Sequence, residues 1–117
     1  MTREGFISDL RAMGLELTER EPQFVMFPWT VPVGRLAGAK ITLAFQVNGM
    51  NPPGGPHVSP RLLPMNPVAG KHPNDGIHPS DLGDTWQYWS RPFPNWAETD
   101  RSGRAYMAHI RHLFATL

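Results

Sequence analysis

Near the N-terminus, apolar side chains recur at intervals of three and four residues, the spacing of one face of an α-helix. The positions that share this spacing are Phe6, Ile7, Leu10 and Met13. Gly14 follows directly, and glycine is favoured just after a helix ends because it adopts a positive φ without strain. The pattern therefore predicts a short helix over residues 2–13.

The same spacing returns at the other end of the chain, over residues 100–117. Its apolar positions are Tyr106, Met107, Ile110, Leu113, Phe114 and Leu117. Thr99, Asp100 or Ser102 can cap the start, since their side-chain oxygens accept hydrogen bonds from free N–H groups of the first turn. We predict a central helix that is buried along Tyr106, Ile110, Leu113 and Leu117.

Between these helices the hydrophobic period changes to two, as expected of strands with one buried face. The clearest case is AKITLAFQV, residues 39–47, which places Ile41, Leu43, Phe45 and Val47 on one face. QFVMF, residues 23–27, is predicted to be a strand that ends at Pro28. The glycines between the two segments suit a hairpin connection.

HVSPRLL, residues 57–63, is predicted to be a third strand that ends at Pro64. Because proline cannot donate to a sheet ladder, Pro60 places this strand at an edge or a bulge. The following stretch, residues 64–98, shows no periodicity and is predicted to be a long ordered loop. Loops of that length in compact domains are usually functional.

The composition adds mainly exclusions. A chain of 117 residues predicts a single domain over residues 1–117, and its net charge of +1 gives no electrostatic case for nucleic acid or an anionic membrane. No apolar run is long enough to cross a bilayer and the N-terminus lacks a signal-peptide core, so a cytoplasmic location is expected. The chain has no cysteine, which excludes disulfides, thiolate zinc sites and cysteine nucleophiles.

Several motifs occur in an order that resembles the ubiquitin-conjugating (UBC) fold family. NPPGGPHVSPRL, residues 51–62, is similar to the proline turn of that family. HPN at residues 72–74 and HPS at 78–80 are similar to its histidine motif, and Trp96 precedes the last helix as the family tryptophan does. The string from Trp86 to Arg91, W-x-x-W-S-R, resembles the compact bacterial branch.

This resemblance implies an α+β, UBC-like fold: an N-terminal helix, an antiparallel β-meander, a long ordered active-site loop and a central C-terminal helix. It implies an enzyme that accepts the C-terminus of a ubiquitin-like protein from an activating (adenylating) enzyme and transfers it to a target lysine. It implies neither a cofactor nor a metal. It also suggests a bacterial conjugation operon with a role in antiphage defence.

In the family, a cysteine between the histidine motif and the tryptophan carries the acyl group, and here two serines compete for that place. Ser90 lies six residues before Trp96, close to the usual interval, and is the preferred nucleophile. Ser80 fits only if HPN is the true motif and the following loop has grown. An acyl group on Ser90 or on Ser80 would be held as an oxyester. The sequence fits a protein with a native serine at this place, and it equally fits one in which serine replaces a natural cysteine.

A serine hydroxyl is a weak nucleophile without a base. His78 or His72 is the candidate base, and Arg91 could stabilise an oxyanion or hold the incoming C-terminal tail. Asn74 matches the family asparagine, which is associated with the oxyanion or with loop order. If HPS is the true motif, Ser80 replaces that asparagine.

Three alternatives stand beside this interpretation. The tryptophans could form a hydrophobic plug, with Ser90 only capping a backbone group. The chain could be a catalytically inactive UBC variant that presents a ubiquitin-like partner. A metal-dependent hydrolase is the most distant, with sites at His109 and His112 or at His72, His78 and Asp81.

The resemblance also implies a docking surface for the activating enzyme. In the family this surface is the N-terminal helix, which here carries Arg3 and Arg11. The simpler interpretation is that both arginines are solvated surface charges.

Overall fold

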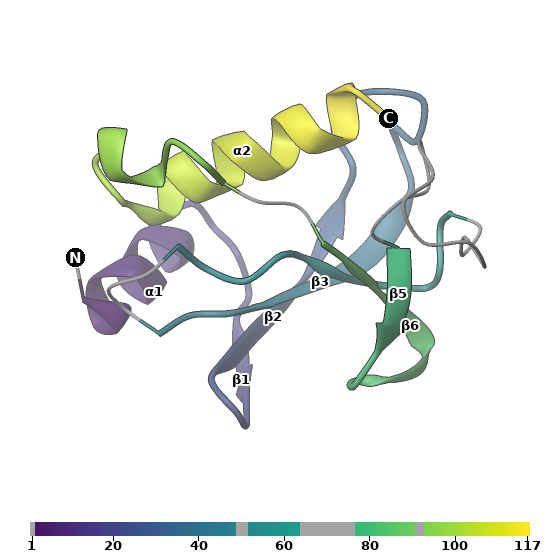
Figure 1. Ribbon diagram of the computed structural model, residues 1–117, viewed down its shortest axis with the longest axis horizontal. Coiled ribbons are helices and arrows are strands. Elements are labelled where there is room, and N and C mark those ends of the chain that lie inside the picture. Colours follow the sequence, from purple (N-terminus) through teal and green to yellow (C-terminus); the bar gives the residue numbers. More distant parts are fainter. Residues whose placement is uncertain (1, 49–51, 64–76, 91–92) are drawn as a thin grey trace.

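The computed structural model describes residues 2–48, 52–63, 77–90 and 93–117. It contains a six-stranded antiparallel sheet, two α-helices and one turn of 3-10 helix (Figure 1). This arrangement confirms the predicted α+β class. Within the part of the chain that is described, no helix is long and apolar enough to span a membrane.

The sheet has the strand order β1-β2-β3-β4-β6-β5. Its strands are β1 (Thr18–Arg20), β2 (Phe24–Thr30), β3 (Lys40–Gln46), β4 (His57–Ser59), β5 (Ile77–Ser80) and β6 (Gly83–Trp89). The first four strands form a meander, and the β5–β6 hairpin extends it by pairing β6 with β4. The helical elements are α1 (Arg3–Ala12), η1 (Trp96–Glu98) and α2 (Gly103–Ala115).

Both predicted helices are confirmed, with caps that explain their limits. The Thr2 hydroxyl accepts a hydrogen bond from Gly5 N at 3.0 Å, and Gly14 beyond the end of α1 has a φ of +84°. Of the three candidate caps for α2, the structure uses Ser102, which accepts a hydrogen bond from Ala105 N at 3.1 Å. Helix α2 ends at Ala115, so Leu117 lies outside it.

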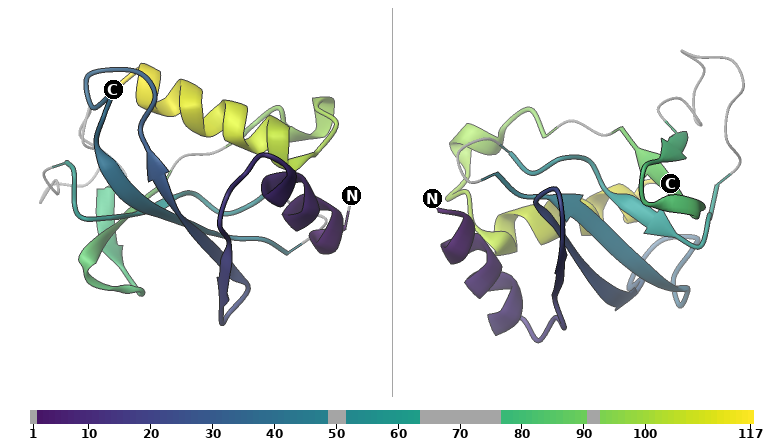
Figure 2. Two further views of the ribbon diagram at one scale, coloured as in Figure 1. Left: turned by 180° about the vertical axis from the view of Figure 1, so that it is seen from behind. Right: turned by 90° about the horizontal axis from the view of Figure 1, so that it is seen from below.

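The two helices approach each other closely near the start of α2 (Figure 2). The Asp9 carboxylate accepts a hydrogen bond from Gly103 N at 3.0 Å. A Cβ atom on Gly103 would lie 2.9 Å from Asp9 Cβ and 3.0 Å from Phe6 O. Glycine at position 103 therefore allows the helices to pack.

The main core lies between the sheet and the two helices. It buries Phe6 and Leu10 of α1 together with Tyr106, Ile110 and Leu113 of α2. The alternating face of β3 that the sequence predicted (Ile41, Leu43, Phe45 and Val47) is buried in the same core. A smaller cluster (Phe24, Ala44 and Leu82, with Met26 and Trp86 packed against it) contains no helical residue, and we call its side of the sheet the outer face.

Two strand predictions are corrected. Strand β2 continues through Pro28 to Thr30. Proline is tolerated there because β1 pairs with β2 only as far as Met26, which leaves one edge of β2 unpaired at Pro28. Strand β4 ends at Ser59, before Pro60, and lies inside the sheet between β3 and β6, so the predicted edge position is wrong.

The predicted long loop is also corrected. Within residues 64–98, residues 77–89 form the β5–β6 hairpin, while residues 64–76 lie outside the described residues. The alternation in β6 was hidden because both faces carry large rings: Trp89 is buried in the core and Trp86 packs on the outer face. Gln87 also made the alternation of β6 hard to recognise, because it is a polar residue at a fully buried position.

Candidate functional site

Ser90 directly follows β6 and is exposed at the rim of an open groove. The groove has a volume of about 510 Å³ and is lined by Pro52, Pro53, Gly55, Tyr88, Ser90, Phe93 and Pro94. It thus lies between the proline turn and the aromatic segment that the sequence singled out. Of the sequence-predicted site residues, Arg91, Asn74 and His72 lie outside the described residues.

One wall of this groove is the proline turn, which hydrogen bonds from β6 and from α2 hold in place and which approaches the β6 backbone closely at Gly55. Trp89 N donates to Pro56 O at 2.9 Å, and a Cβ atom on Gly55 would lie 2.4 Å from Trp89 O. The Tyr106 hydroxyl of α2 donates to Gly54 O at 2.6 Å, and burial raises the pKa of this hydroxyl. These contacts fix the position of the wall relative to Ser90.

Phe93 also lines the groove, and it stacks on His109 with ring centroids 4.2 Å apart. Burial lowers the pKa of His109, and the nearby His112 lowers it further. His109 therefore packs against the Phe93 wall of the groove, and the lowered pKa favours its neutral form. Among the described residues, no cluster of three or more His, Asp or Glu side chains could hold a metal ion.

His78 lies in β5, directly opposite Tyr88 of β6. Tyr88 precedes Ser90 by two residues in the chain. Its exposed ring stacks on Tyr88 with centroids 6.1 Å apart. Tyr88 also contacts His57 of β4, with centroids 4.7 Å apart. The three rings form a row across β4, β6 and β5 on the outer face, close to the end of β6 that carries Ser90.

His57 is a candidate that the sequence interpretation missed. Its Nδ1 lies 2.7 Å from the Oγ of Ser80, the runner-up nucleophile. Burial lowers the pKa of His57, and the negative charge of Asp81 opposes this shift. The alternation of HVS around Val58 could have placed His57 on the outer face, but the contact with Ser80 depends on the pairing of β4 with β6 and of β6 with β5.

His57 forms part of a second pocket, with a volume of about 280 Å³, on the outer face. Its lining includes Phe24, Leu82 and Tyr88 as apolar or aromatic walls, and Arg20 and Asp81 as charged groups. Tyr88 and Gly55 line both this pocket and the Ser90 groove, so the two sites share a wall.

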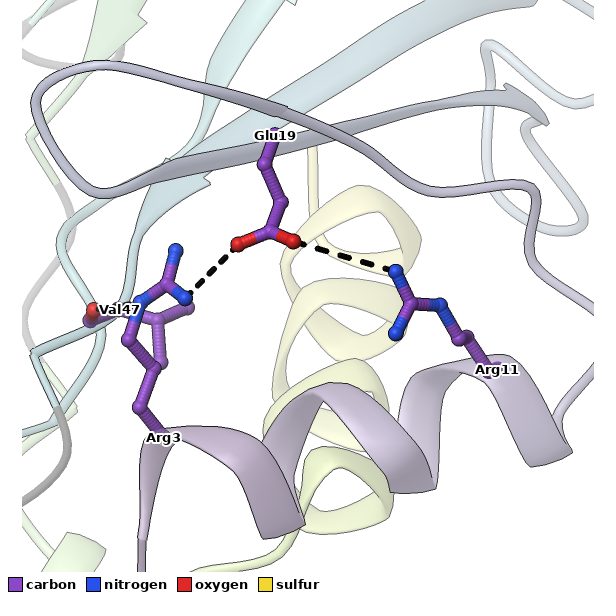
Figure 3. Close-up of polar contacts among 4 residues, drawn as sticks. All are labelled: Arg3, Arg11, Glu19 and Val47. Atoms are coloured by element: carbon purple, nitrogen blue, oxygen red, sulfur yellow. Dashed lines mark hydrogen bonds and ion pairs between the residues drawn. The ribbon is translucent and has the colours of Figure 1, made fainter.

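The two arginines of the predicted docking helix differ in their contacts (Figure 3). Arg3 donates from Nε to Val47 O at 3.0 Å and forms an ion pair with Glu19 at 2.8 Å. Arg11 reaches the same carboxylate only at 4.0 Å, and 57% of its side chain is exposed. Arg3 therefore ties α1 to the sheet, whereas Arg11 is available to a partner.

Comparisons of the chain with protein-family models, with curated proteins and with solved structures found no match. A functional assignment therefore depends on the sequence motifs and on the geometry described above.

Proposed function

We propose that this protein is a cytoplasmic conjugating enzyme for a ubiquitin-like protein. In this proposal an activating enzyme delivers the C-terminal acyl group of the ubiquitin-like protein to Ser90, which holds it as an oxyester. A lysine amine of the target protein then attacks the ester. The proposal extends the motif resemblance to a UBC-like fold, and the helix, antiparallel meander and final α2 helix are compatible with it.

The observation that carries the proposal is the position of Ser90 at the rim of a groove between two stiff walls. Proline and aromatic side chains form these walls, and an extended peptide tail could lie between them with its end at the serine hydroxyl. The hydrogen bonds from Trp89 and Tyr106 to the proline turn fix that wall of the groove relative to β6 and α2. Such preorganisation favours the positioning of a flexible tail.

When the Ser90 oxygen attacks the activated carbonyl carbon, the bond from that carbon to the carrier group of the activating enzyme breaks, and the serine proton requires an acceptor. His57 and His78 both lie opposite Tyr88, on the two strands beside β6, and we assign the role of base to His78, whose ring is exposed as Ser90 is. In the second step the target amine forms the new amide bond while the bond to Ser90 Oγ breaks, and the oxygen takes up a proton. Arg91 and Asn74 remain the proposed oxyanion and tail contacts.

The chemical stability of the adduct tests the proposal. When the chain is incubated with its activating enzyme, the ubiquitin-like protein and ATP, the adduct should survive thiol reductants and be cleaved by mild base or hydroxylamine. Ser90→Ala should abolish it, whereas Ser90→Cys should form an adduct that reductant cleaves, because a thiolate is the more available nucleophile. An adduct that persists in Ser90→Ala and is lost in Ser80→Ala would show that the nucleophile is Ser80.

The second candidate function is that of a non-catalytic scaffold that presents the ubiquitin-like protein to another enzyme. The observation that favours it is the absence of cysteine from all 117 residues. A scaffold would bind the ubiquitin-like protein, as measured by isothermal titration calorimetry, without forming any adduct. Equal affinity of the natural chain and Ser90→Ala, with no adduct in either, would support the scaffold.

A further inference from the structure

The His57–Ser80 pair on the outer face has the arrangement of a nucleophile and its base. Ser80 Oγ lies 2.7 Å from His57 Nδ1 and also accepts a hydrogen bond from Leu82 N at 3.1 Å. Since a backbone N–H can only donate, the hydroxyl proton of Ser80 must be directed elsewhere. Among the described residues, His57 Nδ1 is the one acceptor within hydrogen-bonding distance of that hydroxyl.

This pattern is satisfied when His57 is neutral and carries its proton on Nε2. Burial favours the neutral ring by lowering its pKa. Asp81 lies near enough for its charge to favour the imidazolium, the form that would appear after His57 takes the serine proton. His57 is thus suited to act as a base that is neutral before the reaction, and the Asp81 carboxylate stabilises the charged form that it takes during the reaction.

We propose that Ser80 and His57 form a second catalytic site, in which Ser80 takes up the acyl group of small activated esters and water then releases it. This inference does not depend on the proposed conjugating function. His57 and the chain neighbours of Ser80 (Pro79, Asp81 and Leu82) line the outer-face pocket. Ser80 itself is half-buried at the margin of this pocket and is the last residue of β5, paired with Gly83 of β6.

The acylation step proceeds by one proton transfer and one displacement. Ser80 Oγ forms a bond to the carbonyl carbon of the ester while its proton moves to His57 Nδ1. The bond from that carbon to the leaving oxygen then breaks, and the leaving group departs as the alcohol or the phenolate. His57 returns the proton to the leaving group or to solvent, so the product is a neutral acyl-serine ester and a neutral imidazole.

Hydrolysis reverses these roles. A water oxygen attacks the carbonyl carbon of the acyl-serine as His57 accepts a proton from the water. The bond between that carbon and Ser80 Oγ breaks, and Oγ regains a proton from His57. The products are a carboxylic acid and the free serine, and no oxidant or metal is needed.

The pocket limits the class of substrate. A volume of about 280 Å³ is near the lower end for small-molecule sites, so a short acyl group fits better than a long chain. Phe24 and Leu82 offer apolar contact to such an acyl group. The titratable groups that line the pocket with His57 are Arg20, Glu21, Asp81 and Tyr88.

The test uses the full chain with two probes, p-nitrophenyl acetate and an alkyl fluorophosphonate, and no protein partner. We expect p-nitrophenolate release from the first, and from the second a covalent label that mass spectrometry locates on Ser80. Ser80→Ala should abolish the label, and His57→Gln should slow labelling by about 100-fold, since a positioned base contributes roughly 10²–10⁴-fold. Ser8→Ala, an exposed serine in α1, is the matched control and should label at the natural rate.

A pH profile of the natural chain separates catalysis from a structural role and needs no variant. The labelling rate should rise as His57 loses its proton below about pH 6.5 and should be level above pH 7. A label on Ser90 or on another residue, no label at all, or a rate in folded His57→Gln equal to the natural rate would each overturn the inference. Because no ubiquitin-like protein is present, these outcomes are independent of whether Ser90 forms a conjugate.

Discussion

At the scale of single residues, Gln87 shows how a buried polar side chain joins β6 to the segment that follows β4. It is fully buried, and its Oε1 accepts hydrogen bonds from Leu62 N at 3.0 Å and Leu63 N at 3.2 Å. Its Nε2 donates to Leu63 O. These hydrogen bonds satisfy backbone N–H and C=O groups of the segment after β4, which has no neighbouring strand to pair with them among the described residues.

We predict that Gln87→Leu destabilises the fold by roughly 1–3 kcal/mol for each buried backbone group that it leaves without a partner. The free energy of unfolding from urea denaturation provides the measurement. Gln46→Ala is the control, since the Gln46 side chain is exposed, and it should change that free energy by less than about 1 kcal/mol. Equal effects of the two substitutions would show that burial of Gln87 is not what matters.

The titration of His57 should make the free energy of unfolding depend on pH. Its pKa is lowered in the folded chain by burial, so between the folded and unfolded pKa values the unfolded chain binds more protons. His57 therefore contributes stability that is present above about pH 6.5 and is lost as the pH falls through the folded pKa. The half-buried His109 acts in the same direction.

We expect the free energy of unfolding to fall between pH 7 and pH 5 in the natural chain, and to fall less steeply in His57→Gln. Chemical denaturation at a series of pH values measures both slopes. Identical slopes in the two proteins would mean that the pKa of His57 does not change on folding.

At the scale of elements, α2 organises the main core. Leu113 lies in this helix and is 7% exposed, so its side chain has no room to rearrange into solvent. Leu113→Ala should lower the free energy of unfolding by roughly 2–5 kcal/mol, since it removes buried apolar atoms and leaves a cavity. A change near zero would contradict the placement of α2 against the sheet.

The close approach of α1 and α2 depends on the absence of a side chain at Gly103. Gly103→Ala would bring its methyl group within 3.0 Å of Phe6 O and must push the two helices apart, which should cost on the order of 1–3 kcal/mol. Gly5→Ala is the matched helical control, because its methyl group would meet only the Thr2 side chain, at 3.2 Å. Gly5→Ala is expected to leave thermal unfolding nearly unchanged, and a greater loss there than in Gly103→Ala would refute the close approach.

Elements with one apolar face could be predicted from the sequence, and elements with two large-residue faces could not. The helix around Phe6 and Leu10 and the strand around Leu43 show a single period, which fixes their type and their buried side. Strand β6 carries Trp86 on one face and Trp89 on the other, so its period of two was not visible. The contact between His57 and Ser80 spans 23 residues and arises only from the order in which β4, β6 and β5 pair.

At the scale of the whole molecule, Arg11 is the residue of α1 that tests docking of the activating enzyme most cleanly. Reversing the charge of Arg3 would break its bond to Val47 O and its ion pair with Glu19, so that change would combine docking with stability. Arg11→Glu alone keeps the Arg3 side chain and removes only the 4.0 Å ion pair between Arg11 and Glu19. If α1 binds the activating enzyme, Arg11→Glu should slow acyl transfer from that enzyme several-fold.

Single-turnover transfer assays provide the measurement for Arg11→Glu. Arg111→Glu, at an exposed position of α2, is the matched control and should transfer at the natural rate. Equal rates for Arg11→Glu and the natural chain would place the docking surface elsewhere.

The most direct measurement for the central proposal is the site of the conjugate. The chain is incubated with its activating enzyme, the ubiquitin-like protein and ATP, digested, and analysed by tandem mass spectrometry. The proposal predicts a peptide in which Ser90 carries the C-terminal residues of the ubiquitin-like protein, and the loss of that peptide in folded Ser90→Ala. A conjugate on any other residue, or none with an activating enzyme that is active on its own partner, would contradict the role of Ser90 as acyl carrier.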